Sequence, residues 1–186
     1  MSTILVADRS VVGPTHIAEL YELRGRLVSE ISERLGTTLA SLITYSEVAR
    51  DTSLEEALTE GPDHLYGSNL QHALLLARVA SRTTGSTRVV LITYSLPSAH
   101  HVSGKPFFMV PPVPATLEAT RREVENCALD GIEIDVFLVA PAVDGERREE
   151  LESFFETLLD DKGGIQVSVS PDDDLGPVVD NVLERQ

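Results

Sequence analysis

Three side chains in the sequence have the types that acid–base and nucleophilic chemistry requires, namely Asp8, Ser68 and His100. A carboxylate, a hydroxyl and an imidazole can act as acid, nucleophile and base when they lie within hydrogen-bond reach of one another. All three fall in or beside predicted loops, so the fold could bring them together. A hydrolase that uses these residues is therefore one hypothesis for this chain.

The motifs that usually accompany such chemistry are missing. The segment after the first predicted strand reads Asp8-Arg-Ser-Val-Val-Gly13 instead of GxGxxG, and the sequence contains no GxxxxGK[ST], GxSxG or HExxH. The single Cys127 excludes an internal disulfide framework and a CxxC metal or redox site. These absences argue against a dinucleotide enzyme, a P-loop NTPase and an α/β-hydrolase, and they leave the hydrolase as an alternative.

The hydrophobic pattern predicts strands and helices that alternate along the chain. Strands are expected over 3–7, 39–44, 88–93, 132–139 and 165–169, with a short antiparallel strand around 48–51. Helices are expected over 15–35, 54–58, 68–80, 116–129, 151–159 and 170–183, and an irregular, proline-rich insert over 94–114. The alternation predicts a single α/β domain over 1–186, with a doubly wound, mostly parallel central sheet covered by helices on both faces.

Ligands of such folds bind in a crevice outside the carboxyl ends of the strands. The loops expected to border that crevice are 8–13, 66–69, 94–101 and 140–144. Any functional site should therefore lie among these loops.

Three of these segments resemble the loops of a von Willebrand factor type A (vWA) domain. They read Asp8-Arg-Ser10-Val-Val12, Gly67-Ser68-Asn69, and Thr93-Tyr94-Ser-Leu-Pro97-Ser-Ala-His100. The resemblance extends over about 3–183 and is strongest to bacterial and archaeal cytosolic members. It implies a Rossmann-like fold and a metal-ion-dependent adhesion site, which the family builds from an Asp-x-Ser-x-Ser loop, a threonine and a later aspartate.

The metal motif of that family is matched only in part. Asp8 and Ser10 match the first loop and Ser68 keeps the hydroxyl of the threonine, whereas Val12 and Tyr94 stand where a serine and an aspartate belong. Mg²⁺ prefers near-octahedral oxygen ligation that includes carboxylates. The resemblance therefore implies a degenerate site, with at most weak Mg²⁺ binding and no cofactor expected.

Each of these residues also has a purely structural explanation. Ser68 followed by Gln71 fits a helix capping box, and Asp8 can accept backbone N–H bonds in a tight loop. The ring of Tyr94 can fill the vacated crevice by packing over Val12. The sequence leaves these alternatives open.

The insert supplies the candidates for contacts with a partner, namely His100, Phe107 and Phe108. His100 and His101 are adjacent and would point opposite ways on an extended segment, which favours a solvated pair over a chelating one. The apolar run Phe107-Phe108-Met109-Val110 either folds back over a helix or forms the contact surface of a structural homo-oligomer.

Charge and hydropathy limit the possible partners. The chain has 15 Lys and Arg against 30 Asp and Glu, a net charge of −15 that would repel a nucleic-acid backbone. No apolar run is long enough to cross a membrane, and the N-terminal segment does not resemble a signal peptide, so a cytoplasmic location is expected. The favoured hypothesis is a non-catalytic protein–protein interaction module without a small-molecule substrate. As the resemblance implies, it would serve as an adaptor or assembly factor beside a MoxR-type AAA+ ATPase or another vWA protein.

Overall fold

The computed structural model of this chain describes residues 2–10, 16–63, 67–140, 145–160 and 162–185. Its strands are β1 (Thr3–Asp8), β2 (Leu39–Tyr45), β3 (Ala49–Asp51), β4 (Arg88–Thr93), β5 (Ala99–Val102), β6 (Lys105–Phe108), β7 (Glu133–Val139) and β8 (Gln166–Val169). Its helices are α1 (Ile17–Leu35), the 3₁₀ turn η1 (Gly36–Thr38), α2 (Leu54–Thr59), α3 (Leu70–Thr84), α4 (Pro114–Leu129), α5 (Gly145–Leu159) and α6 (Leu175–Leu183).

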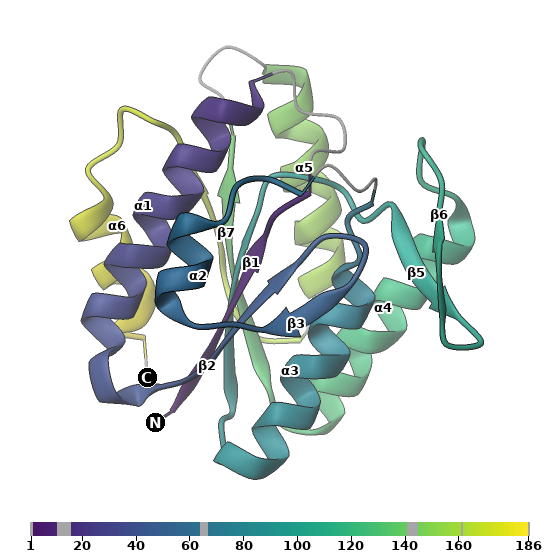
Figure 1. Cartoon of the computed structure of the whole chain (residues 1–186), viewed down its shortest axis with the longest axis horizontal. Coiled ribbons are helices and arrows are strands. Elements are labelled where there is room, and N and C mark those ends of the chain that lie inside the picture. The colour runs from purple at the N-terminus through teal and green to yellow at the C-terminus, as the bar shows by residue number, and fades with distance from the viewer. Residues whose placement is uncertain (1, 11–15, 64–66, 141–144, 161, 186) are drawn as a thin grey trace.

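Six strands form the central sheet in the order β3-β2-β1-β4-β7-β8. Every neighbouring pair is parallel except β2 and β3, which are antiparallel. Helices lie on both faces of this sheet, and the carboxyl ends of the parallel strands meet at its upper edge in Figure 1. The predicted doubly wound, Rossmann-like α/β fold is confirmed.

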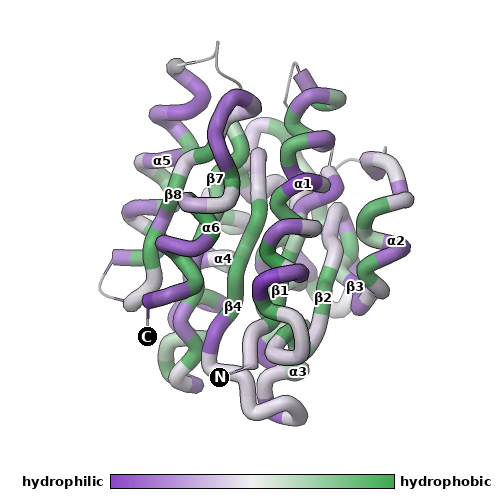
Figure 2. The backbone as a smooth tube through the Cα atoms, turned by 90° about the vertical axis from the view of Figure 1, so that its left-hand side faces the viewer, coloured by the Kyte–Doolittle hydropathy of each residue, from purple (hydrophilic) through white to green (hydrophobic). Residues whose placement is uncertain are grey.

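Two hydrophobic cores hold the helices to the sheet because the parallel strands are apolar on both faces (Figure 2). One core joins alternate strand residues to α3, α4 and α5, and it contains the buried Cys127. The other joins the intervening strand residues to α1 and α6. No helix in the described part of the chain is long and apolar enough to span a membrane.

The prediction of an irregular insert over 94–114 is wrong in part. Residues of this segment form a β5–β6 hairpin in which Ala99 pairs with Phe108 and Val102 with Lys105. Ser103 and Gly104 make the turn with φ of 51° and 77°, left-handed values that glycine adopts readily. Pro106 is tolerated because β6 is an outer strand with one unpaired edge, so the prolines of this segment concealed a real strand pair.

Candidate functional site

The carboxyl group of Asp8 lies at the end of β1 and is fully buried. Its Oδ2 accepts hydrogen bonds from Ser95 Oγ at 2.7 Å, Thr93 Oγ1 at 2.9 Å and the Tyr45 hydroxyl at 3.3 Å. Its Oδ1 accepts one from the Ser10 backbone N–H at 2.8 Å. The carboxyl group is therefore surrounded by donors from three neighbouring strands and their loops.

Burial raises the pKa of Asp8 above its ordinary value, because desolvation penalises the charged form. The hydrogen bonds from Ser95, Ser10 and Thr93 oppose this shift by favouring the carboxylate. Burial also raises the pKa of Tyr45 well above its usual value, so this phenol stays a neutral donor. The donors thus offset part, and not all, of the cost of burying the charge.

Ser68 lies beside Asp8, and the predicted capping box at this residue is wrong. Its Oγ is 3.4 Å from Asp8 Oδ2, and its backbone N–H donates to Ser98 Oγ at 2.9 Å. The N-cap of α3 is Asn69, whose side-chain oxygen accepts from the His72 N–H at 3.0 Å. The N-cap lies one residue later than predicted, at Asn69, so the Ser68 hydroxyl takes no part in capping and can donate to the carboxyl group.

The Tyr94 side chain holds the loop that follows β1 in place. The ring is fully buried in the core that contacts α1, because Tyr94 continues the face of Val90 and Ile92 on β4. Its hydroxyl donates to the backbone oxygen of Ser10 at 2.6 Å. Val12, over which this ring was predicted to pack, lies outside the described residues. Tyr94 therefore fills core space and holds the loop at Ser10.

The bond between Tyr94 and Ser10 yields a stability prediction. Tyr94→Phe removes the donor and leaves a buried carbonyl unpaired, so we expect the free energy of unfolding to fall by about 1–2 kcal/mol in urea titrations. Tyr21→Phe is the matched control, since its hydroxyl donates to the Glu60 carbonyl at 2.8 Å from a half-buried position that water can reach. An effect at Tyr94 no larger than at Tyr21 would contradict the described role.

A buried cation, Arg24 on α1, lies next to the acidic group. Its Nε donates to the Asp8 backbone oxygen at 2.9 Å and its Nη1 to the Ala57 backbone oxygen at 2.6 Å. The side chain is fully buried, and its guanidinium carbon lies 4.9 Å from the ring centre of Tyr21. Burial lowers the pKa of Arg24, while the charge of Asp8 acts in the opposite direction. The site therefore contains one buried acidic group and one buried basic group.

These residues do not fit a divalent cation, the cofactor that the vWA resemblance implies. Among the described residues of this hydrogen-bonded cluster, Asp8 supplies the one carboxyl group, whose oxygens already accept five hydrogen bonds from side chains and backbone. The Arg24 guanidinium, bonded to the Asp8 backbone oxygen, adds a positive charge nearby. Mg²⁺ sheds its water reluctantly and needs oxygen ligands with negative charge. Among the residues that the structure describes, no group of three or more His, Cys, Asp or Glu side chains is placed to hold a metal ion.

The structure brings Asp8 and Ser68 together and directs His100 elsewhere. His100 Nδ1 lies 3.0 Å from Thr116 Oγ1, and its ring contacts Phe107 edge-on at 5.3 Å. His100 is 7% exposed, so the prediction of a solvated histidine is wrong here. Packing of the hairpin against α4 buries the ring, and this burial lowers its pKa.

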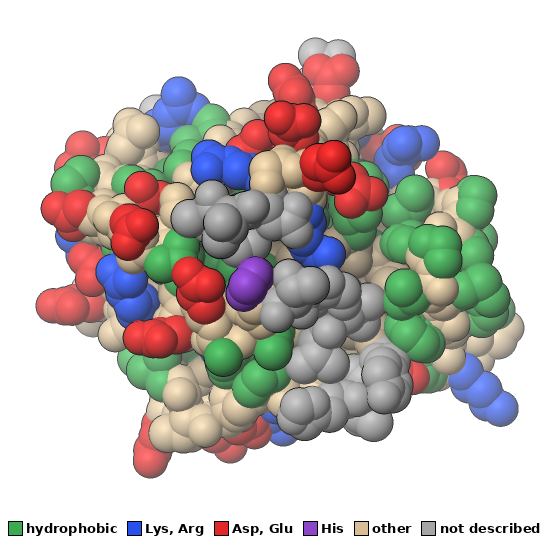
Figure 3. All heavy atoms as spheres, turned by 90° about the horizontal axis from the view of Figure 1, so that it is seen from above, with side chains coloured by type: hydrophobic (Ala, Val, Ile, Leu, Met, Phe, Trp, Pro, Cys, Tyr) green, Lys and Arg blue, Asp and Glu red, His purple; other side chains and the backbone are tan. Residues whose placement is uncertain are grey.

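The two phenylalanines of the insert differ in exposure. Phe107 is 38% exposed on the hairpin, whereas Phe108 is half-buried and lies close to Gly67. Gly67 has a φ of 148°, and a Cβ there would lie 3.1 Å from Ala99 Cβ, so this close approach requires glycine. From above, hydrophobic side chains gather on the side of the molecule where the hairpin lies (Figure 3).

Of the loops expected to border the crevice, residues 11–13, 66 and 141–144 lie outside the described part of the chain. The remaining residues of those loops place Asp8, Ser10 and Ser68 at one edge of the sheet, as the sequence predicted. Four further contributors were not predicted as site residues, namely Arg24, Tyr45, Thr93 and Ser95.

Comparisons with known proteins agree with this architecture. The model of a family described as "Rv0959-like protein, vWA domain" matches residues 26–183, a stretch that begins after Asp8 and Ser10. The chain is also similar to the crystal structure of the pilus adhesin SpaC from Lactobacillus rhamnosus GG. The TM-score is 0.63 and the identity 14%, over 97% of this chain and 30% of the adhesin chain, which shows a shared fold. No curated protein matches the chain.

Proposed function

Because the chain belongs to the Rv0959-like vWA-domain family, we propose that it is a non-catalytic protein–protein interaction module whose adhesion site is degenerate. The observation that supports this most is the closed hydrogen-bond cluster around Asp8, which uses the carboxyl oxygens internally. A partner would then bind through protein contacts alone, without a bridging metal ion.

The cost of placing a divalent ion at Asp8 supports partner binding that does not depend on metal. A divalent ion at Asp8 would have to displace donors from Ser10, Thr93 and Ser95, and it would place two positive charges near buried Arg24. In a water-excluded site such repulsion is much stronger than at the surface. Dehydration of Mg²⁺ would not be compensated by the remaining hydroxyl groups.

The same geometry supports a role other than hydrolysis. Ser68 has a carboxyl neighbour, but His100, the base of the hydrolase hypothesis, is engaged with Thr116. A nucleophilic serine needs a base within hydrogen-bond reach to accept its proton.

The expected partner is another protein in the cytoplasm, either a MoxR-type AAA+ ATPase or a second vWA protein, and this chain would act as its adaptor or assembly factor. This part of the proposal rests on the family resemblance, which is an associational argument. The net charge of −15 adds a physical criterion, since electrostatic steering favours a partner face of positive potential.

The test compares partner binding with and without divalent cations. We expect a purified MoxR-type ATPase from the same organism to bind the immobilised chain equally well in Mg²⁺ and in excess EDTA, with nucleotide left out of both buffers. A vWA protein that has the complete Asp-x-Ser-x-Ser loop is the control, and its binding should be lost in EDTA. Binding that EDTA abolishes, or no binding to either partner class, would refute the proposal.

A further inference from the structure

Two histidines that are far apart in the sequence, His72 on α3 and His101 on β5, lie side by side in the folded chain. Their ring centres are 4.2 Å apart, and the ring planes are tilted by 57°. Both side chains are half-buried, where the start of α3 meets β3 and the β5–β6 hairpin. We call these two residues the histidine pair.

The hydrogen bond of His72 shows which of its ring nitrogens carries the proton. Its Nδ1 lies 3.0 Å from the backbone nitrogen of Ala49, the first residue of β3. A backbone N–H can only donate, so Nδ1 must be the unprotonated nitrogen that accepts. The neutral ring therefore has its proton on Nε2, and a charged ring, with protons on both nitrogens, could not make this bond.

His101 is held in the same tautomer by Asn69. Its Nδ1 lies 3.1 Å from Asn69 Nδ2. Two other bonds set the orientation of this amide, because Oδ1 accepts from the His72 N–H at 3.0 Å and Nδ2 donates to the Glu47 carbonyl at 2.9 Å. Asn69 must therefore present its NH₂ group to His101, and the ring must accept. Both rings of the histidine pair are thus neutral in the folded structure.

This arrangement does not suit a metal ion. A histidine binds a metal through an unprotonated ring nitrogen, and in both rings that nitrogen already accepts a hydrogen bond. The pair also belongs to no larger group of potential metal ligands among the residues that the structure describes. The histidine pair is therefore better suited to respond to protons than to metals.

Protonation of either ring would break its contact with a neighbouring segment. A proton on His72 Nδ1 would face the Ala49 N–H, and one on His101 Nδ1 would face the Asn69 amide group, so donors would oppose donors. Two charged rings whose centres are 4.2 Å apart would also repel each other. Burial lowers the pKa of His72, and the positive charge of His101 acts in the same direction.

Other ionisable side chains lie on the segments that pack against the pair. Within one turn of His72, the side chains of α3 are uncharged. The ionisable residues on the other segments are Glu47 before β3, Arg50 in β3, His100 in β5 and Lys105 in β6. The partner of His100 is the Thr116 hydroxyl, which can donate or accept, so that contact does not require one protonation state. The bonds of the histidine pair, by contrast, require neutral rings.

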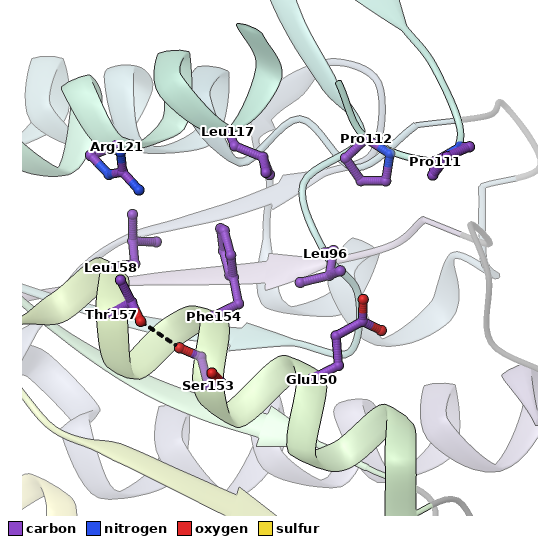
Figure 4. A pocket seen from close by; sticks show the side chains of 10 residues that line it. All are labelled: Leu96, Pro111, Pro112, Leu117, Arg121, Glu150, Ser153, Phe154, Thr157 and Leu158. Atoms are coloured by element: carbon purple, nitrogen blue, oxygen red, sulfur yellow. Dashed lines mark hydrogen bonds between the residues drawn. The ribbon is translucent and has the colours of Figure 1, made fainter. Parts of the chain in front are cut away.

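These bonds are among those that attach the hairpin to the body of the molecule, from which it projects (Figure 1). The His101 N–H donates to Gln71 Oε1 at 3.1 Å, beside the ring contact with Asn69. Leu96 before the hairpin and Pro111 after it line a cavity of about 460 Å³ between α4 and α5 (Figure 4). Because packing around both connections is incomplete there, the position of the hairpin depends in part on its polar contacts with α3.

We propose that the histidine pair is a pH-sensitive contact, which holds the root of the β5–β6 hairpin against α3 and β3 while both rings are neutral. When the rings take up protons, the bonds to Ala49 and Asn69 are lost and the root of the hairpin is released from α3. This contact lies away from Asp8, and its response to pH does not depend on the function proposed above.

NMR of the full-length wild type tests the contact directly. At about pH 7.5, ring nitrogen chemical shifts should show both rings neutral, with the proton on Nε2. As the pH is lowered toward about 5, the amide hydrogens of Ala49 and His101 should lose protection from exchange, after correction for the intrinsic rate. The amide hydrogen of Val90, in the centre of the sheet, should keep its protection.

His72→Asn separates the hydrogen bond from the charge, because the asparagine Oδ1 can accept in place of Nδ1 and does not titrate. As the pH falls below about 6.5, the wild type should lose free energy of unfolding relative to this variant, because the unfolded chain then binds a proton that buried His72 does not. Groups that titrate alike in both proteins, Asp8 included, cancel in this difference. His16→Asn, at an exposed residue outside the pair, is the matched control and should leave the pH dependence unchanged.

His72→Ala removes the acceptor altogether and should speed exchange of the Ala49 amide hydrogen by about tenfold at neutral pH, as loss of one hydrogen bond does. Circular dichroism of each variant checks that it is folded, and the measurements on the wild type do not require the variants. A proton on Nδ1 of either ring at neutral pH would overturn the inference. Equal pH dependence of the wild type and His72→Asn would overturn it as well.

Discussion

Arg24→Ala is expected to lower the free energy of unfolding by about 4 kcal/mol, because it leaves two buried carbonyl groups without donors and opens a cavity beneath the sheet edge. Those carbonyls belong to Asp8 and Ala57, and both accept from the guanidinium in the folded protein. The change also leaves Asp8 without the nearby positive charge that favours its ionised form. Urea titration monitored by circular dichroism measures the effect.

Arg26→Ala is the matched control for this prediction, since Arg26 lies on the same helix and donates one exposed hydrogen bond to the Pro171 carbonyl. Its loss should cost less than about 0.5 kcal/mol, as is usual for exposed positions. Similar costs at the two arginines would show that Arg24 does not support the site as described.

Asp8→Ala is expected to cost about 3 kcal/mol, because the Ser10 N–H and the hydroxyls of Thr93 and Ser95 lose a shared buried acceptor. Asp8→Asn keeps one carbonyl oxygen and should cost less. Asp51→Ala is the control, since its carboxylate accepts from Ser41 Oγ at 2.6 Å in an exposed position. An Asp8→Ala cost no larger than that of Asp51→Ala would contradict a central role for the carboxyl group.

The pH dependence of the same variants tests the environment of Asp8. Because burial raises the pKa of Asp8, the folded protein retains a proton at pH values where the unfolded chain has lost it. The contribution of Asp8 to the free energy of unfolding therefore falls as the pH rises from the pKa of an ordinary carboxyl group to the raised pKa of Asp8 in the folded protein. The wild type should gain stability relative to Asp8→Asn as pH falls through that window, and an opposite trend would indicate a lowered pKa.

The fold could be predicted from the sequence because its strands are apolar on both faces and its helices have one apolar stripe. The parallel strands and the edge strand β8 were found from this pattern. The β5–β6 hairpin was missed because its signal is local turn chemistry at Ser103 and Gly104 within a proline-rich stretch. Such short pairs bury few side chains, so hydrophobic periodicity barely marks them.

The site was predicted in part, and what was missed depends on contacts between distant residues. Asp8 and Ser68 could be placed together from the topology alone, since both were expected in loops at the carboxyl ends of the parallel strands. Arg24 left one trace in the sequence, a charge within the apolar stripe of its helix between Leu23 and Leu27. The burial of His100 left none, because it depends on how the hairpin packs against Thr116.

The central claim is that neighbouring hydrogen-bond donors occupy the carboxyl oxygens of Asp8, and that this cluster holds no metal ion. Its most direct test is calorimetric titration of the wild-type chain with MgCl₂ at neutral pH, with Asp8→Asn titrated in parallel. The account predicts no saturable heat with a Kd tighter than about 1 mM in either protein, because the described cluster has one carboxyl group and a buried arginine nearby. Saturable micromolar Mg²⁺ binding by the wild type that disappears in Asp8→Asn would contradict it.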